Sequence, residues 1–223
     1  MGWRHEVKHE INMADMIILR ARLSVFMQPD IHGTDGRYDV RSLYFDNMYD
    51  KALREKLNGI GKREKFRIRF YNMDTSFIRL EKKQKRDGFS RKESVPVSIV
   101  DVKTLMSTQI NRVRESQEAL LGELFQKMQS QGLRTKTIVE YTREAFTCEN
   151  GNVRITFDTD IRTGISPDGF LVPDCVTIPV SEHAAILEVK WDSFLPSVIR
   201  DALQLTGRKE SSFSKYEACR IYG

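Results

Sequence analysis

Basic side chains recur at every second position between residues 65 and 71, where the sequence is KFRIRFY. In an extended strand, successive side chains point to opposite faces, so Lys65, Arg67 and Arg69 share one face and the apolar residues share the other. Three like charges side by side repel each other unless an anion lies among them. Arginine offers paired donors to phosphate oxygens and lysine offers a point charge, so this face is suited to phosphate. One such strand taken alone is explained as simply by a solvated face.

The same alternation returns in at least five other segments, which favours a ligand over solvent. The charged-face positions of these segments are Glu6, Lys8 and Glu10; Arg79, Glu81, Lys83 and Lys85; Tyr141 and Arg143; Arg154, Thr156 and Asp158; and Glu188 and Lys190. If the sheet closes into a barrel, these faces line its interior, where a polyanion would neutralise them. The carboxylates would repel phosphate, but they suit a hard cation such as Mg2+ or Mn2+.

Length and composition limit the class of protein. With 223 residues, the chain is long enough for one β-rich domain, and we expect a single domain over residues 1–223. The formal net charge of +5 fits nucleic acid or any other polyanionic ligand. The three cysteines form no C-x-x-C pair, which excludes a cysteine-rich zinc site, and the four histidines lack metal-ligand spacing.

The N-terminal residues contain no apolar segment typical of a signal peptide, and no apolar run approaches the length of a membrane span. We therefore expect a cytoplasmic protein. Any membrane partner would have to be another chain.

Periodicity along the chain predicts short strands separated by a few helices. Strands are expected over residues 3–11, 38–45, 65–71, 77–85, 89–97, 135–146, 152–160 and 184–191. Helices are expected over residues 13–27, 46–57 and 196–205 and near the C-terminus, with a helical insertion or lid at about 98–131. About eight strands joined mostly as hairpins predict an α+β fold, an antiparallel β-barrel with flanking helices.

Nine short motifs occur in an order that resembles one known family. They are Lys8, SLYFDN at 42–47, RIR at 67–69, LEKK at 80–83, FSRK at 89–92, YTREAF at 141–146, VRITFD at 153–158, LEVK at 187–190 and FSKY at 213–216. Together they resemble the catalytic domain of the vacuolar transporter chaperone complex, the VTC or polyphosphate polymerase domain. That family belongs to the triphosphate tunnel metalloenzyme superfamily, and the resemblance covers nearly the whole chain.

The resemblance implies a closed tunnel of eight antiparallel strands. In such a tunnel, the γ-phosphate of ATP is transferred to a growing polyphosphate chain. The implied catalytic and phosphate-binding residues are Lys8, Arg67, Arg69, Lys83, Lys92, Arg143, Arg154, Lys190 and Lys215. Glu188 is the implied ligand of the divalent cation, Mn2+ or Mg2+.

Two differences from related proteins limit the functions that we expect for this chain. The first strand has Glu6-x-Lys8-x-Glu10 where the adenylate cyclase and thiamine triphosphatase branch has Glu-x-Glu-x-Lys. The inositol-phosphate-sensing domain and the membrane spans of the eukaryotic polymerase subunits are also missing from this sequence. We therefore do not expect this chain alone to export polyphosphate.

For several charged residues and two histidines, the sequence allows roles other than phosphate or metal binding. Four carboxylates are either further metal ligands or partners that orient a tunnel arginine, namely Glu6, Glu10, Glu81 and Asp158. Three basic residues of one strand are expected on a solvated face, namely Lys82, Lys85 and Arg86. His5 and His9 fall on the opposite face from Lys8, so we expect them in packing or at the surface.

Three functions stay open at this point. The first is a metal-dependent polyphosphate polymerase, and the second is a hydrolase of inorganic triphosphate, nucleoside triphosphate or an RNA 5′ end. The third is a non-catalytic module that binds polyphosphate or nucleic acid. Sheets that bind nucleic acid usually present aromatic side chains among the basic ones, whereas the phenylalanines of 65–71 lie opposite the arginines, so we do not expect DNA as a partner.

Overall fold

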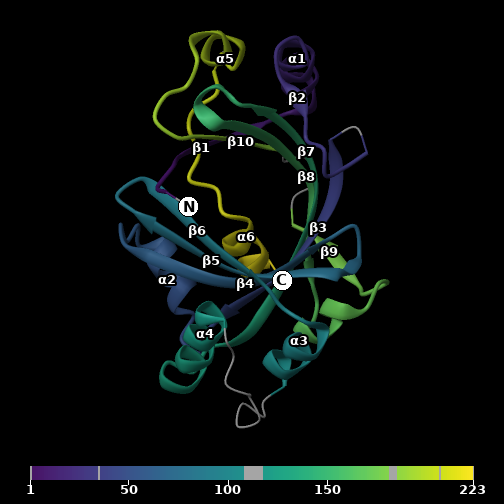
Figure 1. Ribbon diagram of the computed structural model, residues 1–223, viewed down its shortest axis with the longest axis vertical. Helices are drawn as coiled ribbons and strands as arrows, with labels where there is room; N and C mark the ends of the chain where they lie inside the picture. The colour runs from purple at the N-terminus through teal and green to yellow at the C-terminus, as the bar shows by residue number, and fades with distance from the viewer. Residues whose placement is uncertain (1, 35, 108–117, 181–184, 206, 223) are drawn as a thin grey trace.

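A computed structural model describes residues 2–34, 36–107, 118–180, 185–205 and 207–222. Its strands form one antiparallel sheet and are β1 (His5–Ile11), β2 (Gln28–Pro29), β3 (Arg37–Asp46), β4 (Arg63–Tyr71), β5 (Asp74–Arg86), β6 (Phe89–Pro96), β7 (Arg134–Cys148), β8 (Val153–Gly164), β9 (Thr177–Pro179) and β10 (Ala185–Trp191). Eight of them follow one another in the order β1-β10-β8-β7-β3-β4-β5-β6, and Figure 1 shows this sheet curled into a ring.

The ring closes where β1 meets β6. An antiparallel bridge joins Arg4 to Ser90 through two backbone N–H···O=C bonds of 2.9 and 3.0 Å. Closure protects the two outer strands of the sheet, whose edges would otherwise be open to pairing with another chain. The predicted eight-stranded antiparallel barrel with flanking helices is confirmed. The short β2 and β9 were not predicted, because two or three residues show no periodicity.

Two tight turns set the register of β4, β5 and β6. The φ angles are 48° and 58° at Asn72 and Met73, and 49° and 90° at Asp87 and Gly88. Two-residue loops with positive φ at both positions are type I′ turns, whose twist matches that of the flanking strands. This register places the basic face of β4 beside the charged face of β5.

The apolar face of the ring points outward and lies under helices. α3 (Ile99–Met106) and α4 (Ala119–Ser130) pack on β4 and β5, whereas α1 (Met13–Leu23) and α5 (Ser197–Ala202) pack on β8 and β10. Figure 1 shows the two helix pairs at opposite ends of the molecule. The described helices of the expected 98–131 insertion thus lie against the outside of the sheet, and residues 108–117 lie outside the described residues.

The last helix, α6 (Lys215–Tyr222), lies within the outline of the ring in Figure 1. The buried Tyr216 hydroxyl donates to the Asp46 carboxylate at 2.6 Å. Asp46 also accepts bonds from backbone N–H groups in the first turn of α2 (Lys51–Leu57), and Asn47 accepts another. Residues 46 and 47 therefore hold the start of the helix predicted over 46–57, which itself begins only at residue 51.

In α1 and α5, the helix ends depart from the sequence prediction more than the helix starts do. The Asn12 side chain accepts from the backbone of Asp15 and the Asp15 side chain accepts from the backbone of Asn12, which is a capping box. The predicted start of α1 is thus confirmed, but the helix ends at residue 23 and not 27. Likewise, α5 ends at residue 202 and not 205. No glycine or proline marks either end in the sequence.

We predict that Leu124→Ala lowers the free energy of unfolding by roughly 2–5 kcal/mol, because Leu124 is fully buried between α4 and the sheet. Leu57→Ala is the matched control, since this leucine is 54% exposed, and we expect it to cost less than about 1 kcal/mol. Urea denaturation measures both. Equal losses would contradict an outer core under α4.

Candidate functional site

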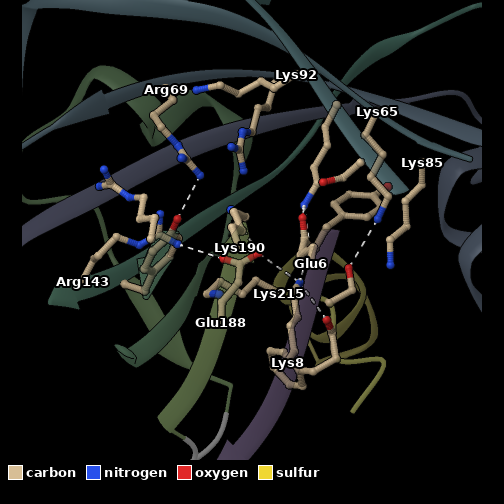
Figure 2. A pocket seen from close by; sticks show the side chains of 18 of the residues that line it. Glu6, Lys8, Lys65, Arg69, Lys85, Lys92, Arg143, Glu188, Lys190 and Lys215 are labelled. Carbon is tan, nitrogen blue, oxygen red and sulfur yellow. Dashed lines mark hydrogen bonds and ion pairs between the residues drawn. The ribbon is translucent and has the colours of Figure 1, made fainter. Parts of the chain in front are cut away.

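The charged face of the ring encloses a cavity of about 1050 Å3. All ten residues predicted for the site line it, namely Lys8, Arg67, Arg69, Lys83, Lys92, Arg143, Arg154, Glu188, Lys190 and Lys215. They come from β1, β4, β5, β6, β7, β8, β10 and α6, so the alternation within each strand placed them on one common surface. Figure 2 shows many of these side chains converging from several strands.

The lining of this cavity is strongly positive. Its described residues include fifteen lysines and arginines and five carboxylates, an excess of ten positive charges. The whole chain has a formal net charge of only +5, so the positive charge is concentrated inside the ring. Like charges in a cavity with low-dielectric walls repel strongly and raise the local concentration of anions.

Glu81 orients the arginines of β4. Its buried carboxylate contacts the Arg67 guanidinium at 2.6 and 2.7 Å and accepts from Lys92 at 3.0 Å. Burial alone would raise the pKa of Glu81, but Arg67, Arg69 and Lys92 hold that pKa well below its usual range. The interpretation of Glu81 as an orienting partner is therefore favoured over that of a metal ligand.

Hydroxyl groups fix the other nitrogens of the same arginines. Arg67 donates to the Tyr44 hydroxyl at 2.8 Å, and Arg69 donates to Ser42 at 3.0 Å and to Tyr141 at 2.9 Å. Ser42 and Tyr44 were not predicted as part of the site. Both lie on the charged side of β3, whose apolar neighbours Leu43 and Phe45 mark the other side, so alternation was the available signal.

Asp158 orients basic side chains of β7 and α6, as Glu81 does for the arginines of β4. It accepts two bonds from Arg143 at 2.7 and 2.8 Å and contacts Lys215 at 2.5 Å. Burial would raise the pKa of Asp158, but these two cations lower it to about 2. Arg154, which lies nearby on β8, donates to the Tyr38 hydroxyl at 2.7 Å and pairs with Asp30.

Glu188 and Glu6 lie among lysines on β10 and β1. In the β1–β10 register, Lys8 is directly opposite Glu188 and Lys190 is opposite Glu6. The Glu188 carboxylate lies 3.2 Å from Lys190 and 3.8 Å from Lys8, and Glu6 accepts from Lys83 at 2.8 Å. Figure 2 shows Glu188 and Lys190 near the centre of the cavity, between its two groups of basic residues.

Few side chains of the site could bind a metal ion. In the part of the chain that the structure describes, no three His, Cys, Asp or Glu side chains are grouped to hold an ion. Glu188 does have one unused neighbour, because the buried Thr156 hydroxyl opposite it on β8 has no hydrogen-bond partner. Mg2+ is commonly held by one or two carboxylates together with substrate phosphates, so this pair fits an ion that arrives with phosphate.

Two predictions for individual lysines were wrong. Lys85 was expected on a solvated face, but it lines the cavity, because it shares the face of Lys83. Lys82 is not solvated either, because it is buried on the outer side of β5 and pairs with Glu123 at 2.6 Å and Glu64 at 3.4 Å. Alternation gives the face of a residue but does not show that α4 brings Glu123 over that face.

Three other predictions concern residues near the ends of the strands. Arg86 is exposed, as expected. Glu10 is exposed and accepts from Ser211, so it lies outside the lined cavity. His5 stacks on Trp191 with ring centres 5.0 Å apart, and His9 contacts the backbone of Lys209, so both histidines serve packing and surface contacts, as predicted.

Together, the fold and this site define a tunnel of antiparallel strands lined with oriented cations. The VTC domain family matches residues 3–221, and the chain belongs to that family. A search of curated protein sequences found no match. No helix in the described ranges is long and apolar enough to cross a membrane.

Solved structures with a similar outline are distant in sequence. PH1012 protein from Pyrococcus horikoshii OT3 is 13% identical over 96% of this chain and 98% of its own, with a TM-score of 0.49. A candidate adenylate cyclase from Bacillus halodurans is 13% identical over 86% of this chain and 83% of its own, also with a TM-score of 0.49. Because the sequence identities and TM-scores of these structures are low, the assignment of the chain to a family rests on the VTC domain match alone.

We predict that Asp158→Asn lowers the free energy of unfolding at pH 7 by roughly 3–5 kcal/mol, because it leaves Arg143 and Lys215 buried without their carboxylate. The folded-state pKa near 2 lies below the unfolded value, so Asp158 contributes stability above about pH 4 that is lost as the pH falls toward 2.

The variant should therefore lose less stability than the wild type between pH 4 and pH 2, which denaturant titrations at several pH values would measure. Asp87→Asn, at an exposed turn, is the control and should change neither quantity by more than about 0.5 kcal/mol. An unchanged acid slope in Asp158→Asn would show that this carboxylate is not held ionised by its partners.

Proposed function

We propose that this protein is a metal-dependent polyphosphate polymerase. It transfers the γ-phosphate of ATP to the end of a polyphosphate chain inside the tunnel. The observation that carries this proposal is the cavity lining, with its fifteen cations and five carboxylates, in a chain of the VTC domain family. A linear polyphosphate has one negative charge or more on each unit, and it matches a long row of cations better than a compact anion does.

Phosphoryl transfer needs little covalent chemistry from the protein, since positioning and charge stabilisation supply most of the catalysis. The arginines of this tunnel are already positioned. Arg67 and Arg69 are held by Glu81 and by hydroxyls, and Arg143 is held by Asp158 through two bonds. A triphosphate would meet these guanidinium groups with little further loss of side-chain freedom, which favours tight and oriented binding.

The lysines have a different role from the arginines in this mechanism. Lys8, Lys83, Lys92 and Lys215 each contact a buried carboxylate while lining the cavity. They would neutralise the phosphates next to the transferred group and the charge that develops on the leaving group. Their carboxylate partners orient them when no phosphate is bound.

Glu188 is the proposed ligand of a divalent cation, Mn2+ or Mg2+. Burial would raise the pKa of Glu188, but Lys190 and Lys8 hold it well below its usual range, so the carboxylate is available as an anion. Once bound through Glu188 and phosphate oxygens, the cation would offset the negative charge of the reacting phosphates. The orphaned Thr156 hydroxyl beside Glu188 would complete the polar surroundings.

We predict that the purified protein converts ATP, in the presence of Mn2+ or Mg2+, into chains that form a ladder on a gel stained for polyphosphate. Glu188→Gln should reduce synthesis by roughly a hundredfold or more, because it removes the charged metal ligand while keeping its shape. Glu149→Gln, at an exposed position away from the cavity, is the matched control and should be as active as the wild type.

Other products would contradict the polymerase. Orthophosphate without chains would identify a triphosphatase that uses the same clamp, with water as the acceptor. No turnover of ATP, GTP or inorganic triphosphate, together with RNA binding that is lost in the Arg67→Ala/Arg69→Ala double variant, would identify a binding module.

A further inference from the structure

Lys215 is held in the site differently from the other predicted site residues. Nine of the ten come from strands, whose backbone hydrogen bonds fix their positions, whereas Lys215 is the first residue of α6. Its ammonium group reaches Asp158 at 2.5 Å and lies 4.8 Å from the centre of the Tyr141 ring. Figure 2 shows Lys215 near the centre of the cavity. The position of this cation therefore depends on the contacts that hold α6 inside the ring.

A buried hydrogen bond holds α6 at the residue that follows Lys215. The Tyr216 hydroxyl donates to the Asp46 carboxylate at 2.6 Å, and both residues are almost fully buried. Burial and this bond raise the pKa of Tyr216 above its usual value, so the hydroxyl stays protonated and keeps its role as donor. A hydrogen bond to a carboxylate is shorter and stronger than one between neutral groups. We call the contact between Tyr216 and Asp46 the anchor bond.

The acceptor of the anchor bond is itself fixed on two sides. Asp46 is the last residue of β3, where it pairs with Arg134 of β7 in the sheet. Its oxygens also accept from the backbone N–H groups of Ala52 and Leu53 at 2.9 and 3.2 Å. The anchor bond thus connects α6 both to the sheet and to the first turn of α2.

Two ion pairs between α6 and the region of α2 are more exposed than the anchor bond. Arg220 donates to Asp50 at 2.9 Å, and Glu217 pairs with Lys56 at 3.2 Å. Between 12% and 27% of each of these side chains is accessible to solvent, which screens such pairs and weakens their contribution. Of these three contacts, the anchor bond is the most buried and lies nearest in sequence to the start of α6.

We propose that Tyr216 and Asp46 are positioning residues for Lys215. The anchor bond holds the first turn of α6 so that Lys215 stays at Asp158, which it shares with Arg143, and meets the phosphates bound there. The Tyr216 hydroxyl acts through the helix and not on the ligand, because its hydrogen atom is committed to Asp46. This inference rests on the proposed function, since it takes the ligand of Lys215 to be a triphosphate group.

Binding of inorganic triphosphate without turnover tests this role. Calorimetry would compare the wild type, Tyr216→Phe, Lys215→Met and the double variant. Phenylalanine can keep the ring contact with Tyr44, whose centre is 5.0 Å away, and removes only the hydroxyl. We expect Tyr216→Phe to lower the affinity roughly tenfold when Lys215 is present. In the Lys215→Met background it should lower the affinity less than about threefold, because the residue that it positions is then absent.

Tyr49→Phe is the matched control, because Tyr49 is 64% exposed and lies outside the lined cavity, and it should match the wild type. Equal losses from Tyr216→Phe in both backgrounds would show a general role in the fold. Unchanged affinity in Tyr216→Phe would show that the hydroxyl does not position Lys215. Either result would overturn the proposal.

A second readout needs no ligand. Burial would raise the pKa of Asp158, but Arg143 and Lys215 lower it to about 2. When Lys215 moves away in Tyr216→Phe, this pKa rises toward its unfolded value, so the variant should lose less stability than the wild type between pH 4 and pH 2. Lys215→Met should show the same change, and adding Tyr216→Phe to it should change the acid dependence no further. Denaturant titrations at several pH values would measure all four proteins.

The two readouts separate the positioning role from the proposed function. A wild type that does not bind triphosphate would contradict the proposed function, whereas a weaker acid dependence in Tyr216→Phe would still support the positioning of Lys215. An acid dependence in Tyr216→Phe equal to that of the wild type would overturn the positioning role, whatever the protein binds.

Discussion

Buried ion pairs determine the architecture of this protein. In the described part of the chain, Glu6, Glu81, Asp158 and Glu188 lie almost fully buried among lysines and arginines and fix the direction of those side chains. Their number is too small to neutralise the fifteen lysines and arginines of the lining. Such an arrangement is costly, because desolvation opposes every charge inside the ring. It persists because the rest of the fold supplies stability elsewhere and because an anionic ligand can supply the missing charge.

Two of the three core clusters lie outside the ring, where the alternate residues of the strands pack under α1, α3, α4 and α5. The third lies on the inner face of the sheet, where Val40, Val139 and Ile186 belong to one cluster with Tyr216 and Cys219 of α6. Each strand therefore serves two tasks through one alternation, with packing on one face and charge on the other. This separation lets the tunnel residues be chosen for chemistry, since they contribute little to the hydrophobic stabilisation of the fold.

Alternation was also what made much of the site predictable. It assigned each residue of the eight strands to a face, and all ten predicted site residues line the cavity. It could not show which partner crosses from a distant strand or helix. Lys82 illustrates this limit, since its environment depends on Glu123 of α4. The hydroxyl contacts of Tyr44 likewise depend on strand pairing between distant parts of the sequence, which a single sequence does not specify.

The central claim is that the positive interior is the binding site of an extended phosphate chain. The most direct measurement is an experimental structure of the protein with long-chain polyphosphate, determined without nucleotide. The account predicts continuous density for a phosphate chain along β4, from Arg69 past Arg67 to Lys65. Density confined to the outer surface, or a cavity that stays free of phosphate at saturating ligand, would contradict it.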